Sequence, residues 1–132
     1  MLTCVDAMVL TDKDGKVIHC NKEWVELTGY SLSEVEGCDC KVLQGSMTNH
    51  AEIRRCSALQ KLNKSSTMNV VNYRKDGSMF INNVTTVPIR GGYRTDGKYD
   101  FLSLKLFFFS SFSMPFFHRF NFHCEQYYLN LT

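Results

Sequence analysis

The chain has 132 residues and a formal net charge of +2 at pH 7. This length suits one domain with its own core and a short tail. Because the charge is close to neutral, the composition gives no basic face for nucleic acid and no acidic tail, and most charged residues are interpreted as a solvated surface.

The N-terminal part is predicted to form a β-hairpin followed by a short helix. Residues 8–11 and 16–20 are β-prone, and the Asp-Lys-Asp-Gly segment at 12–15 between them has strong turn chemistry. Asn21 is a suitable N-cap for the helix, which we expect Gly29 to end.

Two further helices are predicted after this one. Ser31 with Glu34 three residues later forms a capping box for a short helix, which Gly37 closes. Asn49 is the expected start of a longer helix through Lys61, because apolar residues recur there at helical spacing.

The second half of the chain changes to strand patterns. Residues 67–74 and 79–89 are β-prone and are joined by a turn at 75–78, and a last strand is expected at 99–106. Pro88 suits the margin of a strand, because proline cannot donate to a ladder. Hairpins at both ends with helices between them predict an α+β fold. We expect a five-stranded antiparallel sheet with helices packed on one face and a pocket between the two layers.

One short segment combines side chains that can bind and react. In the run Gly-Cys-Asp-Cys-Lys-Val-Leu-Gln at 37–44, the thiol of Cys40 is followed by the cation of Lys41 and then by the amide of Gln44. If the segment is helical, the thiol and the amide lie on one face. Such a set around a cavity would suit a polar heterocycle with an anionic tail. A small buried cysteine is the commoner case, so these residues alone leave both interpretations open.

Two motifs resemble the light-oxygen-voltage (LOV) domains of the PAS superfamily, as found in phototropins and aureochromes. Residues 37–44 are similar to the Gly-x-Asn-Cys-Arg-Phe-Leu-Gln motif of that family, and residues 72–82 to its Asn-Tyr-Arg-Lys-Asp-Gly-x-x-Phe-Trp-Asn motif. The interval between the motifs fits without a gap, and residues 23–30 fit the helix that precedes the first one. The resemblance covers roughly residues 8–101 and implies the PAS fold.

The resemblance implies a sensory switch that binds flavin mononucleotide (FMN) noncovalently and absorbs blue light, and not an enzyme. In that family the sulfur of the motif cysteine, here Cys40, reversibly joins the flavin C4a carbon while N5 gains a proton. The matched positions assign Gln44, Asn72 and Asn82 to the polar edge of the flavin ring or its ribityl chain. The remaining cofactor contacts are assigned to Asp39, Leu43, Arg54 and Lys41, the last standing for a phosphate-binding arginine.

The two strand asparagines flank the predicted turn. We expect an odd-length loop there, which would place Asn72 and Asn82 opposite each other on one face of the sheet. An exposed asparagine is disfavoured in strands, and buried amides must be paired, so the matched positions favour a ligand contact.

Three positions depart from the family pattern. Asp39 replaces an asparagine and cannot donate a hydrogen bond. Many family members have a second phosphate-binding arginine at the position where this chain has Ser57. Arg54, about one turn earlier, is the proposed substitute. The family has a signalling glutamine on the last strand, and this chain has Lys105 or Leu106 at that position. Lysine donates hydrogen bonds but cannot accept them.

The six cysteines of the chain are interpreted as reduced thiols. No basic start followed by an apolar run precedes Asp14, so no secretory signal is visible and we expect an intracellular protein, cytoplasmic or nuclear. Cys38 and Cys40 are too closely spaced for the usual zinc ligand pair, and we expect no metal.

The C-terminal segment breaks the pattern of alternating strands. Nine of the ten phenylalanines lie at or after Phe101, several in doublets or triplets without an amphipathic period. Only 12 uninterrupted residues lie between Lys105 and His118, fewer than the roughly 20 needed to cross a membrane, and we expect no membrane span. We divide the chain into a PAS/LOV domain at 1–106 and a Phe-rich atypical tail at 107–132, and our hypothesis is that this tail is not part of the native domain.

Two other functions stay open. A degenerate PAS module without flavin would act only in protein–protein interaction or dimerisation, whereas the retained thiol and amides favour light sensing. A flavin redox enzyme or sensor would need a source of electrons, and no Gly-rich nicotinamide motif is present.

No kinase signature or basic leucine zipper occurs, so we expect the output domain or partner protein to be encoded elsewhere. We also expect two copies to form a homodimer through the sheet face.

Overall fold

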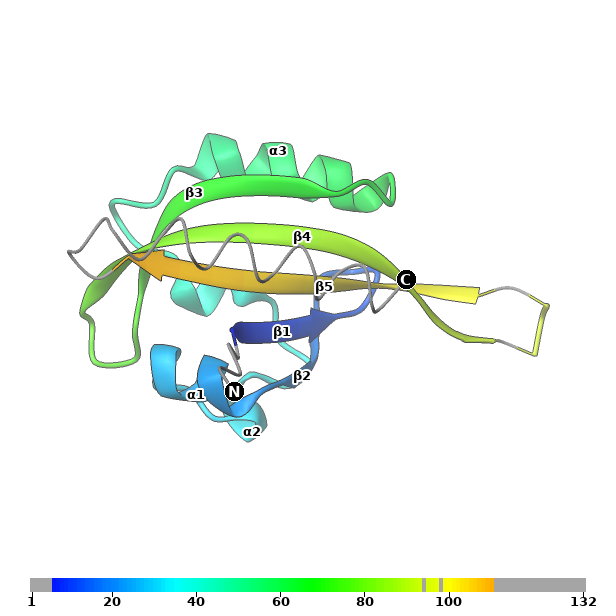
Figure 1. Cartoon of the computed structure of the whole chain (residues 1–132), viewed down its shortest axis with the longest axis horizontal. Helices are drawn as coiled ribbons and strands as arrows, with labels where there is room; N and C mark the ends of the chain where they lie inside the picture. The colour runs from blue at the N-terminus through cyan, green and yellow to red at the C-terminus, as the bar shows by residue number, and fades with distance from the viewer. Residues whose placement is uncertain (1–5, 94, 98, 111–132) are drawn as a thin grey trace, which may run out of the picture.

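The computed structural model describes residues 6–93, 95–97 and 99–110, which form one antiparallel sheet with helices on one face. The elements in chain order are β1 (Ala7–Thr11), β2 (Val17–Cys20), α1 (Lys22–Thr28), α2 (Leu32–Val35), the 3-10 helix η1 (Cys40–Leu43), α3 (His50–Lys61), β3 (Ser66–Tyr73), β4 (Met79–Tyr93) and β5 (Tyr99–Ser110). The five strands are ordered β2-β1-β5-β4-β3, and each neighbouring pair is antiparallel (Figure 1). The predicted fold class is confirmed.

The last strand occupies the centre of the sheet. β5 pairs with β1 on one side and with β4 on the other, so it joins the N-terminal hairpin to the rest of the sheet. It continues to Ser110, past the predicted end at Leu106. Phe107 is buried in the core, with its ring centroid 6.3 Å from that of Trp24. The domain boundary at residue 106 and the interpretation of the tail stay predictions. Residues 111–132 lie outside the described residues.

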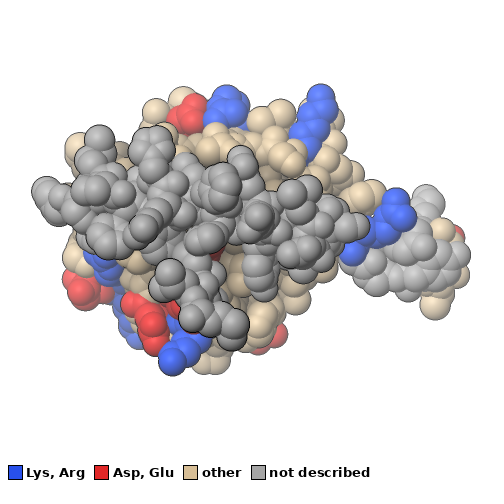
Figure 2. Space-filling model, in the orientation of Figure 1, with Lys and Arg blue, Asp and Glu red and all other residues tan. Residues whose placement is uncertain are grey.

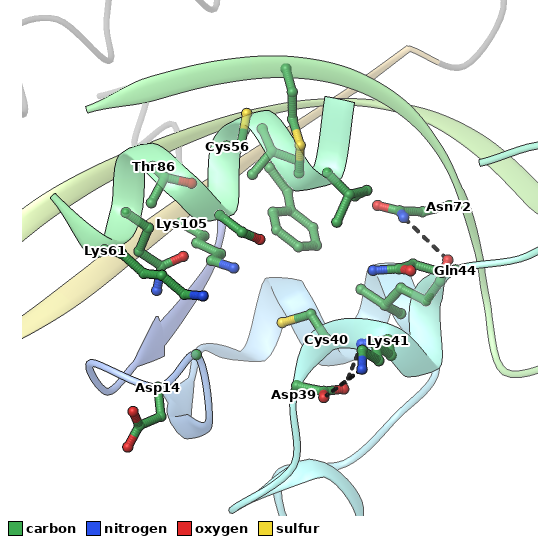
Figure 3. A pocket seen from close by; sticks show the side chains of 18 of the residues that line it. Asp14, Asp39, Cys40, Lys41, Gln44, Cys56, Lys61, Asn72, Thr86 and Lys105 are labelled. Carbon is green, nitrogen blue, oxygen red and sulfur yellow. Dashed lines mark hydrogen bonds and ion pairs between the residues drawn. The ribbon is translucent and has the colours of Figure 1, made fainter. Parts of the chain in front are cut away.

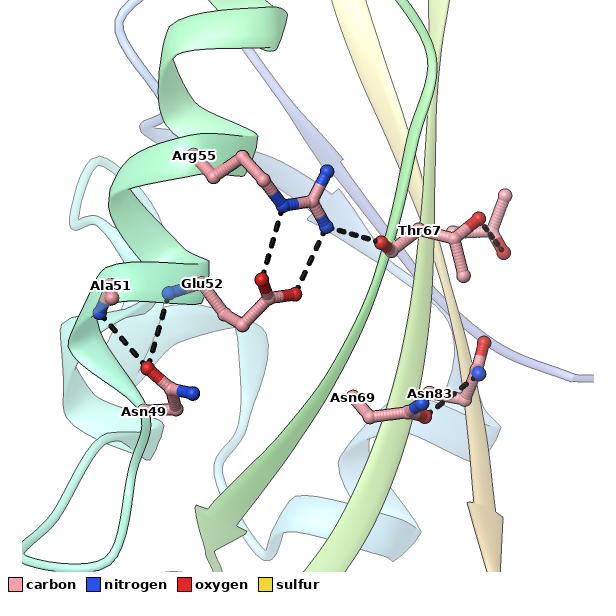
Figure 4. Close-up of polar contacts among 8 residues, drawn as sticks. Asn49, Ala51, Glu52, Arg55, Thr67, Asn69 and Asn83 are labelled. Carbon is pink, nitrogen blue, oxygen red and sulfur yellow. Dashed lines mark hydrogen bonds and ion pairs between the residues drawn. The ribbon is translucent and has the colours of Figure 1, made fainter.

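Two helices begin at the asparagines that the sequence indicates. The Asn21 side chain accepts a hydrogen bond from the Trp24 amide at 3.0 Å, which caps α1. The Asn49 side chain accepts from the amides of Ala51 and Glu52 at 3.1 and 3.2 Å, which caps α3 (Figure 4). Each cap satisfies backbone donors that have no partner within the helix.

The connection from α2 to η1 is fixed against β2. α2 begins with the predicted capping box, in which Glu34 accepts from the Ser31 amide at 3.3 Å, and ends before Gly37. The Gly37 amide then donates to the Val17 carbonyl at 2.8 Å, and the Val17 amide donates to the Cys38 carbonyl at 2.8 Å. Gly37 has a φ of +78°, which glycine adopts without strain, and the chain turns there into η1.

Helix α3 lies alongside the edge strand β3 (Figure 1). Arg55 donates to both carboxylate oxygens of Glu52, at 3.1 and 2.9 Å, and to the Thr67 carbonyl at 2.8 Å (Figure 4). On the outer face of the sheet, Asn83 donates to Asn69 across the β3–β4 pair at 2.8 Å (Figure 4). The Arg55–Thr67 contact links α3, which forms one wall of the site described below, to the sheet.

Pro88 lies inside β4 and not at a strand margin, so that expectation is wrong. It stands opposite Ser103 of β5, whereas the pairing with β3 ends two residues earlier at Ser66–Thr86. At Pro88 the strand therefore has β5 as a neighbour but not β3. The missing N–H breaks no β3 hydrogen bond, which is how a long strand accommodates proline.

The core lies between the inner face of the sheet and the helices. Trp24 of α1 is completely buried at its centre, and residues from the strands, α1, α2 and η1 surround it. Apolar burial of this kind is the main stabilising contribution to folding. The cluster consists of Ala7, Val9, Val17, Cys20, Trp24, Leu27, Val35, Leu43, Val70, Phe80, Val84 and Phe107.

The charged surface is mixed in sign. Figure 2 shows basic and acidic side chains side by side around α1 and α2, and no large patch of one sign on this face of the described part. Lys22 pairs with Glu26 at 3.6 Å, and Lys75 pairs with Glu34 at 2.8 Å. Exposed pairs of this kind contribute little to stability. The expected absence of nucleic-acid binding stays a prediction.

Candidate functional site

A cavity of about 630 Å³ lies between the inner face of the sheet and the helices η1 and α3. Small-molecule sites in proteins have volumes of a few hundred to about 1,000 Å³, so a ligand larger than a few atoms fits here. Its apolar wall is formed by Leu43, Ile53, Met68, Val84 and Phe107. Polar and charged side chains complete the lining, and Figure 3 shows how they lie.

Cys40 is the first residue of η1, and its sulfur points into this cavity (Figure 3). Burial raises the pKa of the Cys40 thiol. The Lys105 ammonium acts in the opposite direction on this pKa, and the Asp39 carboxylate adds to the rise. Because an ordinary cysteine already titrates near 8.5, Cys40 is a neutral thiol at physiological pH.

Asp39 and Lys41 flank the thiol at the edge of the cavity. Asp39 is the N-cap of η1, and its carboxylate accepts from the Lys41 amide at 3.0 Å. The same carboxylate lies 3.8 Å from the ammonium groups of Lys16 and Lys41. Asparagine and aspartate cap helices about equally well, so this aspartate fills the structural place of the family's asparagine. Both residues line the cavity, but the Lys41 side chain is 79% exposed.

Leu43 and Gln44 bring the end of η1 against β3. Leu43 is buried, and its carbonyl accepts from the Asn72 side chain at 3.1 Å. Gln44 lines the cavity next to it, and its side-chain amide has no hydrogen bond among the residues that the structure describes. The amide is therefore available to a ligand.

Asn72 and Asn82 share the inner face of the sheet, but they are not directly opposite. Asn82 pairs with Val70, and Asn72 pairs with Phe80, so the two asparagines are diagonal neighbours. The expectation of a direct cross-strand pair is wrong. The Asn82 side chain donates to the side-chain oxygen of Asn72 (Oδ1) at 2.9 Å.

The Asn82 side chain carries an unpaired acceptor. Asn82 is completely buried, and its Oδ1 has no hydrogen-bond partner within the described part of the chain. Asn82 itself is not among the residues that line the cavity, whereas its partner Asn72 is. A buried acceptor without a partner costs about 1–3 kcal/mol.

Arg54 is the candidate residue that lies apart from the others. It is exposed on α3 and does not line the cavity, whereas Ser57, one helical turn later, does. Its assigned role stays a prediction.

Many cavity residues are missing from the sequence-based set, and three of them carry polar or reactive groups from other parts of the fold. Lys13 comes from the β1–β2 turn, Cys56 from the buried side of α3, and Lys61 from the last turn of α3. Helical spacing marks Cys56 as inward-facing. No local pattern indicates that the two lysines lie beside the motif, because the fold brings these segments together.

Lys105 and Leu106 of β5 are the two candidates for the position of the family's glutamine, and they differ in whether they line the cavity. Lys105 lines the cavity, opposite Thr86 of β4, which lines it too. Leu106 does not line the cavity, and successive side chains of a strand point to opposite faces. Of the two candidates for the position of the family's glutamine, Lys105 is the one whose side chain faces the site.

The free cysteines among the described residues are Cys20, Cys38, Cys40 and Cys56. Within the same residues there is no group of three or more His, Cys, Asp or Glu side chains that could hold a metal ion. The described helices include none that is long and apolar enough to span a membrane. The intracellular location stays a prediction.

Comparison with known proteins identifies the class of this fold and site. The profile of the PAS domain family matches residues 5–103, and the chain belongs to that family. A solved structure titled "Flavin Analogue Sheds Light on Light-Oxygen-Voltage Domain Mechanism" superimposes with a TM-score of 0.70 and 26% identity, covering 92% of this chain and 87% of that one. Within the PAS superfamily, the chain is a LOV domain, as its two motifs predicted.

Curated relatives are longer proteins. The "Blue-light photoreceptor" of Listeria monocytogenes is 38% identical over 87 residues, which is 62% of this chain and 34% of that protein. "Phototropin-2" of Oryza sativa subsp. japonica is 39% identical over 80 residues, which is 61% of this chain and 9% of that protein. The chain thus spans about a third or less of these relatives.

Proposed function

We propose that this LOV domain is a blue-light sensor that binds FMN in the cavity and uses Cys40 as its reacting thiol. The observation that carries the proposal is the position of the Cys40 sulfur, which points into a cavity of about 630 Å³ lined by amides and apolar side chains. The relatives named above are described as a blue-light photoreceptor and a phototropin, which supports the same function.

The lining suits a flat heterocycle with a polar edge. Apolar side chains would cover the ring faces and amides would pair with ring nitrogens and carbonyls, a combination typical of small-molecule sites. The unpartnered Gln44 amide and the side chain of Asn72 would supply part of that hydrogen bonding, and Asn82, which does not line the cavity, donates to Asn72.

The charges of the lining favour a ligand with an anionic tail. Four lysines and two aspartates line the cavity, which leaves a surplus of positive charge. A phosphate group, as in FMN, would be attracted to this surplus, whereas riboflavin lacks that group. The residues are Lys13, Lys41, Lys61 and Lys105 against Asp14 and Asp39.

When bound, the flavin supplies the absorption of blue light and an electrophilic carbon, C4a, next to the nitrogen N5. Cys40 supplies a neutral thiol, whose sulfur would bond that carbon and whose proton would pass to N5. Return in the dark would reverse both transfers, so Cys40 is regenerated and no substrate is turned over. Because the thiol is held at the cavity wall, the reaction is effectively unimolecular.

The signal leaves the domain through a partner or an attached domain. The relatives are longer than this chain, which supports an output region outside it. We include in the proposal that two copies associate through the sheet face. β5 is the central strand of that sheet and carries Lys105 on its inner side, so a change in the cavity reaches the sheet directly.

Absorption spectroscopy of the purified chain tests this function. The chain incubated with FMN is expected to retain it through gel filtration, to lose its blue absorption band on illumination and to regain it in darkness. Cys40→Ala is expected to bind FMN without reversible bleaching. Flavin that binds to the unmodified chain and never bleaches would contradict the sensor, and a folded chain that takes up no flavin would favour an interaction module.

A further inference from the structure

Lys105 places a positive charge at the sheet side of the cavity. Its side chain lines the cavity and is half-buried in the central strand β5. Among the residues that the structure describes, its ammonium forms no hydrogen bond and no ion pair. A partly desolvated cation without a partner favours a ligand that brings negative charge or hydrogen-bond acceptors.

The carboxylates around the cavity do not pair with this cation. Asp39 is already engaged by the ammonium groups of Lys16 and Lys41, each at 3.8 Å. Asp14 is exposed at the β1–β2 turn and forms no ion pair within the described ranges. The charge of Lys105 therefore acts on the contents of the cavity.

Cys40 lies within the electrostatic reach of this lysine. The Lys105 ammonium lowers the pKa of the Cys40 thiol, against the larger rise that burial causes. The charge therefore extends over the part of the cavity at which the Cys40 sulfur points (Figure 3). A flavin that reacts with Cys40 occupies this part.

We propose that Lys105 makes the bound flavin easier to reduce, so that the site responds to reductants as well as to light. This inference rests on the proposed function, because it needs a flavin in the cavity. A neutral amide at this position would act on the flavin only through its dipole. A lysine exerts a full charge in a partly water-excluded site, where electrostatic interactions are stronger than in water.

The direction of the effect follows from the charge balance of reduction. A two-electron donor is oxidised and gives both electrons to the ring, which takes up one proton and gains one net negative charge. A fixed cation stabilises the product more than the starting state, so the reduction potential rises. The donor in the test is dithionite, which is oxidised to sulfite.

The test is the midpoint potential of the FMN-loaded chain, measured by anaerobic titration with dithionite against a reference dye. Lys105→Gln and Lys105→Met are expected to lower the equilibrium constant for reduction about tenfold, which is about 30 mV for a two-electron couple. Lys105→Arg keeps the charge and is expected to stay near the unmodified chain. Lys22→Gln removes the same charge from α1, where Lys22 is 81% exposed, and is expected to leave the potential unchanged.

The outcomes separate this inference from the function on which it rests. Equal potentials in the unmodified chain, Lys105→Gln and Lys105→Met, with flavin binding and bleaching intact, would overturn the role of Lys105 and leave the light sensor standing. Equal shifts in Lys105→Gln and Lys22→Gln would also overturn it, because the effect would then reflect net charge alone. A chain that takes up no flavin would overturn both proposals.

Discussion

Asn82 donates a hydrogen bond to Asn72 at 2.9 Å, while its own side-chain oxygen is buried without a partner among the described residues. The pair Asn83–Asn69 makes the equivalent 2.8 Å contact on the opposite, outer face of the same two strands. One amide pair thus lies beside the cavity, and a matched pair lies away from it. The difference between them isolates the contribution of the inner pair to ligand binding.

Asn82→Ala removes the donor that holds the Asn72 side chain and is expected to weaken FMN binding by about 1–3 kcal/mol, which is roughly 5-fold to 150-fold in Kd. Asn83→Ala removes the same kind of hydrogen bond from the outer face and is expected to leave Kd unchanged. Titration of FMN fluorescence quenching gives both constants. Equal affinities for the two variants would show that the inner amide pair does not contribute to ligand binding.

The alkylation of Cys40 in the flavin-free chain reports the charges around it. Lys105→Gln removes the group that lowers the thiol pKa, and Asp39→Asn removes one that raises it. The pH profile of iodoacetamide labelling at Cys40, followed by peptide mass spectrometry, is expected to move to higher pH in the first variant and to lower pH in the second. Shifts in the same direction would contradict this arrangement.

The raised pKa of Cys40 also predicts a loss of stability in alkali. A thiol whose pKa is higher in the folded chain than in the unfolded chain contributes stability below the unfolded pKa, near 8.5, and loses it as the pH rises through the folded value. Urea unfolding of the flavin-free chain is expected to give a falling free energy above about pH 8.5. Cys40→Ala is expected to flatten this decline, although buried Cys20, whose pKa is also raised, retains part of it. An unchanged slope in Cys40→Ala would be contrary to the prediction.

Gly45 is expected to tolerate no side chain. A Cβ at this position would overlap the ring of Tyr73, whose hydroxyl also accepts from the Met47 amide at 3.0 Å. Gly45→Ala is expected to destabilise the chain by about 1–3 kcal/mol in urea unfolding, as overpacking does. Because the clash is with one ring, Tyr73→Leu in the same chain is expected to restore part of the loss. Equal stability of Gly45→Ala and the unmodified chain would contradict this prediction, because it would show that Gly45 and Tyr73 move apart at no cost.

Features set by neighbouring residues were predictable from the sequence. Asn21 and Asn49 cap their helices because a side-chain oxygen reaches amides two or three residues away. The first hairpin forms at its predicted turn, and β1 and β2 begin within one residue of the expected positions. The class of the site followed from resemblance to the two LOV motifs, because composition and spacing left the buried-cysteine interpretation open.

The register of Asn72 and Asn82 shows the limit of such local reasoning. Pairing them directly requires a turn centred on Gly77, whereas the observed pairs Tyr73–Met79 and Asn72–Phe80 centre it on Asp76. A shift of one residue in the turn changes every cross-strand partner by two positions and keeps each side chain on its face. The shared face was thus predictable, and the partner was not.

Two lysines of the cavity, Lys13 and Lys61, were beyond prediction for a different reason. Lys13 and Lys61 belong to a turn and to a helix end that are far from the motif in sequence, and only the packed fold brings them to one cavity. Arg54, chosen by helical spacing, lies on the exposed side of α3. Helical spacing gives relative positions within one helix, but the orientation of that helix against the sheet depends on its packing.

A crystal structure of the FMN-loaded chain, grown and measured in darkness, tests the central claim most directly. We expect the flavin ring in the cavity between η1 and the sheet, with the Cys40 sulfur directed at the ring and the Gln44 and Asn72 side chains paired with its polar edge. A flavin bound elsewhere, or a Cys40 side chain directed away from the ring, would contradict the account.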